Sequence, residues 1–110
     1  MSLKRLNEES KNILYDILYN VRNEYPRMQF MWSYHFGLGD YVLYYNGSHE
    51  FESDYDFEQK INNDFNLVEV ANKFMDINCC WLSIIRNDDI DYDSDIIEVE
   101  IITNTYKLKK

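Results

Sequence analysis

Apolar side chains recur at helical spacing near the start of the chain, at Ile13, Leu14, Ile17, Leu18 and Val21. This stripe predicts an amphipathic helix. Asn7 has the side chain of an N-cap, and Pro26 should end the helix near Glu24. Tyr15 and Tyr19 fall on the face opposite the stripe, so we expect both rings to be exposed.

The next segment changes from helical spacing to strict alternation. Residues 28–36 place large apolar and aromatic side chains at every second position, which is typical of a strand. Residues 37–40 contain two glycines and predict a turn, and residues 41–45 predict a second strand. Asn46-Gly47 is a strong signal for a type I′ turn, so we expect residues 48–52 to pair back as a third strand.

The second half of the chain begins with helical signals. Ser53 followed by Asp56 resembles a capping arrangement, and Asn66 followed by Glu69 is a second one. Together they predict one long helix or two short ones, ending near Asn78.

Two apolar segments close the chain. Residues 79–86 form an apolar run that we interpret as a central strand, and residues 96–103 alternate again. The acidic segment between them is expected to be the tip of a hairpin.

These elements predict one α+β domain over residues 1–110, in the order α-β-β-β-α-β-β. We expect a mostly antiparallel sheet of about five strands, with two or three helices packed on one face. No internal repeat, linker or low-complexity segment divides the chain. The length is sufficient for one hydrophobic core without disulfides or metal ions.

Charge is distributed unevenly over these elements. The whole chain carries a formal net charge of −9. Between residues 28 and 106, however, sixteen Asp and Glu side chains face only three basic ones, Lys60, Lys73 and Arg86, a local net charge of −13. Such a field repels nucleic acid and attracts basic surfaces. We therefore expect the partner to be a basic protein. We expect no direct contact with nucleic acid.

The expected cellular location is based on signals that the sequence does not contain. No run of about eighteen apolar residues is present, so we expect no membrane-spanning segment. Residues 1–12 are polar and contain no apolar signal-peptide core. The two cysteines are adjacent, which leaves no disulfide framework. A cytoplasmic protein is the expectation.

The densest acidic segment covers residues 88–95 and contains Asp88, Asp89, Asp91, Asp93 and Asp95 around Tyr92. We interpret it as an exposed docking segment for a partner, with Tyr92 as an aromatic anchor. Exposed Tyr15 and Tyr19 are the other candidate contact residues, although the tyrosines also reflect a composition rich in Asn, Ile, Lys and Tyr.

An alternative for the Asp88 to Glu100 segment is calcium or ligand binding. Counted from Asp89, acids occupy positions 1, 3, 5 and 7 of a twelve-residue EF-hand loop, with Glu100 at position 12. Two features oppose this interpretation. Ser94 stands where the loop requires Gly, and residues 96–102 are β-branched where the motif needs a helix. We therefore predict no metal site.

Candidate catalytic groups are few. His35 and His49 are the only histidines, and neither belongs to a cluster with metal-ligand spacing. Cys79 and Cys80 have apolar neighbours and are expected to pack in the core. There is no phosphate-binding glycine loop and no GxSxG motif. We expect no catalytic residues, no cofactor and no enzymatic activity.

In size and charge the chain resembles toxin-neutralising immunity proteins and phage anti-defence proteins, some of which mimic the charge of DNA. The resemblance implies a non-enzymatic inhibitor that docks on a basic, nucleic-acid-handling protein such as a nuclease. A subunit of a larger complex, whose acidic face serves only solubility, is the other alternative.

Overall fold

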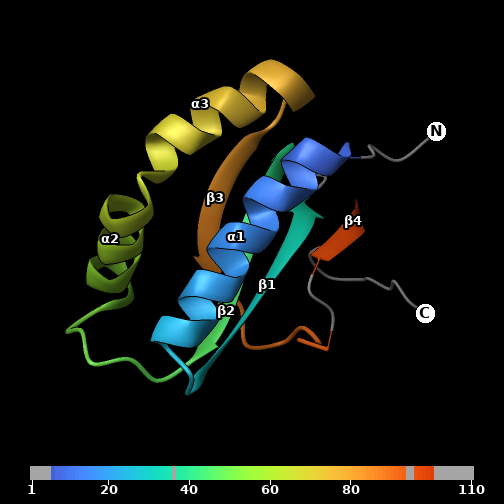
Figure 1. Ribbon diagram of the computed structural model, residues 1–110. Coiled ribbons are helices and arrows are strands. Elements are labelled where there is room, and N and C mark those ends of the chain that lie inside the picture. Colours follow the sequence, from blue (N-terminus) through green and yellow to red (C-terminus); the bar gives the residue numbers. More distant parts are fainter. Residues whose placement is uncertain (1–5, 36, 94–95, 101–110) are drawn as a thin grey trace.

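The computed structural model describes residues 6–35, 37–93 and 96–100, which form three helices and four strands (Figure 1). The helices are α1 (Glu8–Glu24), α2 (Asp54–Phe65) and α3 (Leu67–Asn78). The strands are β1 (Met28–His35), β2 (Asp40–Gly47), β3 (Trp81–Arg86) and β4 (Ile96–Glu100). The predicted α+β class is confirmed.

The four strands form one mixed sheet with the order β3-β2-β1-β4. β1 and β2 are an antiparallel hairpin, whereas β2 pairs with β3 and β1 pairs with β4 in parallel. The prediction of a mostly antiparallel sheet of about five strands is therefore wrong. α2 and α3 form the long connection that two parallel strands require between their ends.

The core lies between the three helices and one face of the sheet. Alternate residues of the central hairpin point to this face, and they are Phe30, Trp32, Tyr41, Leu43 and Tyr45. Each helix adds its apolar stripe, including Leu14 from α1, Phe57 from α2 and Phe74 from α3. The buried indole of Trp32 donates to the Leu14 carbonyl at 2.9 Å and so joins β1 to α1.

Local capping chemistry agrees with the sequence at the starts of α1 and α2. Asn7 Oδ1 accepts from Ser10 N at 2.8 Å, and Ser53 Oγ accepts from Asp56 N at 3.1 Å. Asn66 has left-handed backbone angles, ends α2 and precedes α3. Its side chain makes no capping bond to the backbone of α3 and donates instead to Glu69 Oε1. Two short helices therefore replace one long helix, and α3 ends at Asn78 as expected.

The predicted hairpin at Asn46-Gly47 is wrong. β2 continues to Gly47, where Asn46 pairs with Gln29 and donates to its Oε1 at 3.1 Å. Gly47 alone takes a positive φ, of 113°, whereas a type I′ turn needs positive φ at both residues. Residues 48–52 form no strand and lead instead to α2. The β1–β2 turn lies at residues 37–39, close to the turn predicted there.

The placement of the last two strands is also corrected. β3 is an edge strand, not a central one, and β4 lies at the opposite edge, so the segment between them is no hairpin tip. This connection must cross the sheet, and the helices occupy one face. Tyr92 of the connection lies near Tyr44, whose side chain belongs to the other face. Tyr92 therefore lies over that second face.

Gly47 provides a test of the strand end. A Cβ at this position would lie 3.0 Å from Met28 Cα and 3.1 Å from Arg27 O, whereas a Cβ at Gly39 would meet nothing within 4 Å. Both glycines have positive φ. We expect Gly47→Ala to lower the free energy of unfolding by about 3 kcal/mol and Gly39→Ala by about 1 kcal/mol, measured by urea denaturation. Equal losses would contradict the close approach at Gly47.

Candidate functional site

The parallel pairing of β2 and β3 brings two acidic segments to one end of the sheet. Tyr45 pairs with Arg86, so the residues that follow these two strands emerge side by side. We call residues 48–58 and 86–93 together the acidic end. They contain nine Asp and Glu side chains and one basic side chain, Arg86, for a net charge of −8. More than half of the sixteen acidic residues between residues 28 and 106 therefore belong to the acidic end.

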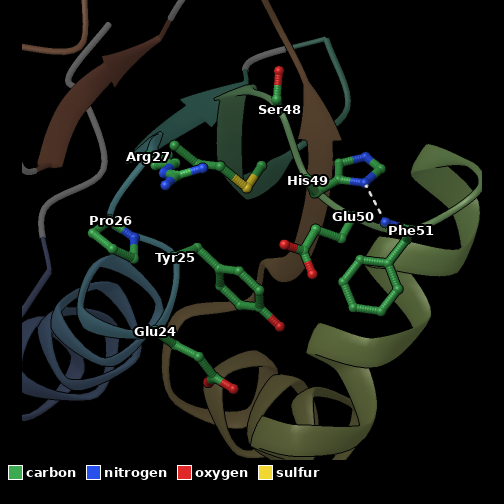
Figure 2. A pocket seen from close by; sticks show the side chains of 9 residues that line it. Glu24, Tyr25, Pro26, Arg27, Ser48, His49, Glu50 and Phe51 are labelled. Atoms are coloured by element: carbon green, nitrogen blue, oxygen red, sulfur yellow. Dashed lines mark hydrogen bonds between the residues drawn. The ribbon is translucent and has the colours of Figure 1, made fainter.

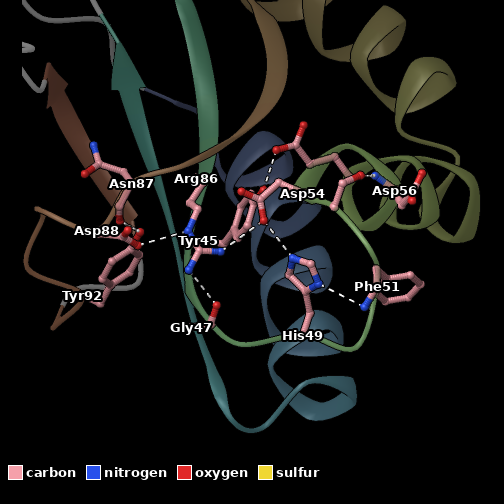
Figure 3. A network of polar contacts seen from close by, with 12 residues as sticks. Tyr45, Gly47, His49, Phe51, Asp54, Asp56, Arg86, Asn87, Asp88 and Tyr92 are labelled. Carbon is pink, nitrogen blue, oxygen red and sulfur yellow. Dashed lines mark hydrogen bonds and ion pairs between the residues drawn. The ribbon is translucent and has the colours of Figure 1, made fainter.

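Arg86 holds the two segments together (Figure 3). Its Nη2 donates to the Gly47 carbonyl at 2.8 Å, and its Nη1 lies 3.3 Å from Asp54 Oδ1 at the start of α2. Its Nε lies 3.3 Å from Asp88 Oδ1, in the segment after β3. The guanidinium carbon lies 5.7 Å from the centroid of the Tyr45 ring. One cation thus links β2, α2 and the acidic segment through directed bonds.

His49 is a positioning residue in this arrangement. Its Nε2 lies 2.8 Å from Asp54 Oδ1, and its Nδ1 accepts from the Phe51 amide at 3.2 Å. The ring stacks on Phe57 with centroids 4.8 Å apart, and only 8% of the side chain is exposed. Both ring nitrogens are engaged, so His49 orders the loop before α2 and has no free lone pair for general-base catalysis.

The ionisation of the site follows from these contacts. The hydrogen bond from His49 lowers the pKa of Asp54 below its usual value of 3.8, and Arg86 lowers it further. Burial raises the pKa of Tyr44 to about 12. Burial also raises the pKa of Tyr45, as does its 2.5 Å hydrogen bond to Glu58 Oε2. These phenols stay protonated at neutral pH, whereas Asp54 stays charged.

The acidic residues predicted as contacts lie together and exposed. Asp88, Asp89, Asp91 and Asp93 are all on the surface, and Asp95 lies outside the described residues. Two short hydrogen-bonded turns order this segment. Asn87 Oδ1 accepts from Asp89 N at 2.8 Å, and Asp91 Oδ1 accepts from Asp93 N at 3.1 Å.

The predicted tyrosines differ in how much ring surface they present. The hydroxyl of Tyr92 donates to the Asn87 carbonyl at 2.5 Å, and its ring is partly buried. Burial, and next the charge of Asp88, raise the pKa of Tyr92. Tyr15 and Tyr19 stack on each other along α1 with centroids 5.7 Å apart, outside the acidic end. Tyr19 is exposed as predicted, but Tyr15 is half-buried against the core.

Several residues of this site were not predicted from the sequence. They are Glu50, Glu52, Asp54, Tyr55, His49 and Arg86. Tyr55 is 68% exposed in the first turn of α2, between two acids. The alternation of acidic and aromatic residues over 50–58 is a visible signal, but its meeting with residues 86–93 depends on strand pairing that the pattern does not specify.

A pocket of about 480 Å³ lies beside the acidic end (Figure 2). Residues 24–28, where α1 passes into β1, line one side, and residues 48–51 line the other. The hydrogen bond from the Phe51 amide to His49 lies in this wall. The pocket therefore shares the loop 48–51 with the acidic end.

The described residues contain no group of three His, Cys, Asp or Glu side chains that could hold a metal ion. The last five residues of the EF-hand-like segment, Ile96–Glu100, form strand β4, where that motif leads into a helix. Of the two cysteines expected in the core, Cys80 is buried, but Cys79 is exposed at the end of α3. No helix within the described ranges is long and apolar enough to cross a membrane.

The chain was compared with known proteins. No protein-family model, no curated protein and no solved structure matches it.

The link through Arg86 can be tested by neutralising it. We expect Arg86→Gln to lower the free energy of unfolding by about 2 kcal/mol, because two carboxylates and a carbonyl lose their donor. Lys73→Gln removes the same charge from an exposed position of α3 and should change stability by less than about 0.5 kcal/mol. Urea denaturation of both variants makes the comparison, and equal losses would show that Arg86 acts only through net charge.

Asp54 predicts a pH dependence of stability. Its folded-state pKa lies below 3.8, so the charged form stabilises the fold above that pH, and this stabilisation disappears as pH falls through the lowered pKa. Asp54→Asn should therefore have a lower urea midpoint than the parent at pH 7, with the difference closing as the pH falls below 3.8. Asp56→Asn removes a carboxylate from the same helical turn and serves as the control. A difference independent of pH would contradict the assignment.

Proposed function

We propose that this protein is a non-enzymatic binding domain that docks its acidic end on a basic, nucleic-acid-handling protein, as an inhibitor of the immunity or anti-defence type. The observation that carries the proposal is the meeting of two acidic segments at the shared end of β2 and β3. A net charge of −8 from residues 48–58 and 86–93 attracts a basic surface and accelerates its approach.

The acidic end also offers contacts suited to a protein partner. Tyr55 is exposed between Asp54 and Asp56, and tyrosines in such positions contribute strongly to interfaces. Arg86 and the turns at Asn87 and Asp91 order the carboxylates before any partner arrives. An ordered surface loses less conformational entropy on binding than a flexible acidic tail would.

Two features support a binding role over a catalytic one. Both nitrogens of His49 are engaged in hydrogen bonds that order the loop. The phenols of Tyr44 and Tyr45 have raised pKa values, so neither supplies a phenolate nucleophile at neutral pH. The same concentration of negative charge that favours a basic protein opposes direct binding of the phosphate backbone of nucleic acid. A basic surface is typical of proteins that bind nucleic acid, so the proposed partner belongs to that class.

The proposal is tested by capturing partners on the immobilised protein from its source cells. We expect basic nucleic-acid-binding proteins, identified by mass spectrometry and released by about 0.5 M NaCl because salt screens the charges. Replacing Asp89, Asp91 and Asp93 by Asn should weaken binding of the captured protein about tenfold.

The control variant replaces Glu9 by Gln and both Asp16 and Asp76 by Asn, all exposed positions outside the acidic end. It changes the net charge by the same amount and should weaken binding less than about twofold. Capture of neutral or acidic proteins, or retention that salt does not affect, would contradict the proposal.

A further inference from the structure

The pocket beside the acidic end combines two carboxylates with two aromatic rings. Glu24 and Tyr25 come from the end of α1, and Glu50 and Phe51 come from the loop after β2. Figure 2 shows the Glu50 side chain directed toward the space between the rings of Tyr25 and Phe51. A volume of about 480 Å³ lies within the range of known ligand pockets, roughly 300–1,000 Å³.

The aromatic walls are fixed by the core beneath them. Tyr25 packs edge-on against Phe57 with centroids 5.2 Å apart, and Phe51 packs on the same ring at 5.7 Å. The backbone of Phe51 is held by its hydrogen bond to His49. Pro26 restricts the backbone of Tyr25. The cavity walls are therefore formed in the absence of a ligand, which lowers the entropy lost on binding.

The cations nearest these walls do not fill the cavity. The guanidinium of Arg27 lies on the rim across from Phe51 in Figure 2. Lys60 is near Tyr25, but its ammonium is bound to both carboxylate oxygens of Asp64, at 2.9 and 2.7 Å. The carboxylates of Glu24 and Glu50 are exposed at the pocket and stand beside the strongly negative acidic end.

We propose that this pocket receives an arginine side chain of the basic partner, an inference that rests on the proposed function and names the group that its partner presents. A guanidinium is planar, stacks on aromatic faces and donates paired hydrogen bonds to carboxylates. The pocket offers both kinds of surface, with Tyr25 and Phe51 for stacking and Glu24 and Glu50 for acceptance. Lysine presents a compact, strongly hydrated charge and uses the ring faces less well.

The pocket is tested with a defined probe, an acetylated and amidated Gly-Arg-Gly peptide, with the matching citrulline peptide as its neutral isostere. Backbone NMR titration should shift resonances of residues 24–28 and 48–51 with the arginine peptide, and the citrulline peptide should bind at least about fivefold more weakly. Equal affinity for the two peptides, or shifts confined to residues 88–93, would overturn the inference.

Variants of two neighbouring glutamates distinguish contacts inside the pocket from the attraction of the overall negative charge. Glu50→Gln removes a carboxylate that lines the pocket and should weaken the arginine peptide about fivefold. Glu52→Gln removes the same charge two residues away, outside the pocket lining, and should weaken it less than about twofold. Phe51→Leu keeps an apolar wall without the aromatic face and should weaken the peptide about threefold.

The outcomes distinguish this inference from the proposed function. Equal losses of affinity for the arginine peptide in Glu50→Gln and Glu52→Gln would show that the overall negative charge alone attracts the cation. This result would overturn the inference about the pocket and leave the acidic end as the docking surface. A loss of affinity in Glu50→Gln but not in Glu52→Gln, seen with the arginine peptide and again with the captured basic protein, supports both proposals. A captured partner that binds independently of salt would contradict the proposed function, whatever the peptide does.

Discussion

The arrangement of this molecule depends on the parallel pairing of β2 with β3. The pairing runs from Asp40 opposite Trp81 to Tyr45 opposite Arg86. It requires the long α2–α3 connection, and that connection completes the core over one sheet face. Because neighbouring parallel strands finish at the same end of the sheet, this pairing brings the residues after Gly47 beside the residues after Arg86. The fold and the proposed docking surface therefore have one cause.

Concentrating nine carboxylates in one place has an electrostatic cost that the structure offsets locally. Arg86 neutralises part of the charge and bonds to Asp54 and Asp88 at the same time. Asp54 and Asp56 lie in the first turn of α2, where the positive end of the helix dipole stabilises them. Glu58 is half-buried and accepts a hydrogen bond from Tyr45. The other acids are exposed to water, which screens their repulsion: Glu50, Glu52, Asp89, Asp91 and Asp93. A surface of this kind stays ordered and still carries a strong negative field.

The pocket and the acidic end differ in the interactions they offer. The acidic end acts through long-range attraction, which raises the rate of association and tolerates many basic surfaces. The pocket offers short-range contacts with fixed aromatic walls, and these discriminate by shape and hydrogen-bond geometry. The loop 48–51 belongs to both, and His49 holds that loop against Phe57 and Asp54. Attraction and selection in the proposed complex would thus share one ordered segment.

Local side-chain patterns are enough to locate the three helices and to give the total charge. Helical spacing indicates all three helices, and the side chains of Asn7 and Ser53 cap α1 and α2 by bonds to backbone within one turn. The sequence also indicated the exposed acids at 88–93, since a run of like charges is stable only in water.

Which strands are neighbours depends on contacts formed only in the folded chain. Asn46-Gly47 has the composition of a hairpin turn, yet Asn46 remains in β2, where pairing with β1 outweighs the turn preference. Residues 79–86 are apolar enough for a central strand, but α2 and α3 pack beside β3 at the edge of the sheet. Strand order depends on contacts between residues far apart in the chain, and neither periodicity nor turn chemistry encodes it. For this reason the meeting of residues 48–58 with 86–93, and the pocket beside them, appeared only in the folded molecule.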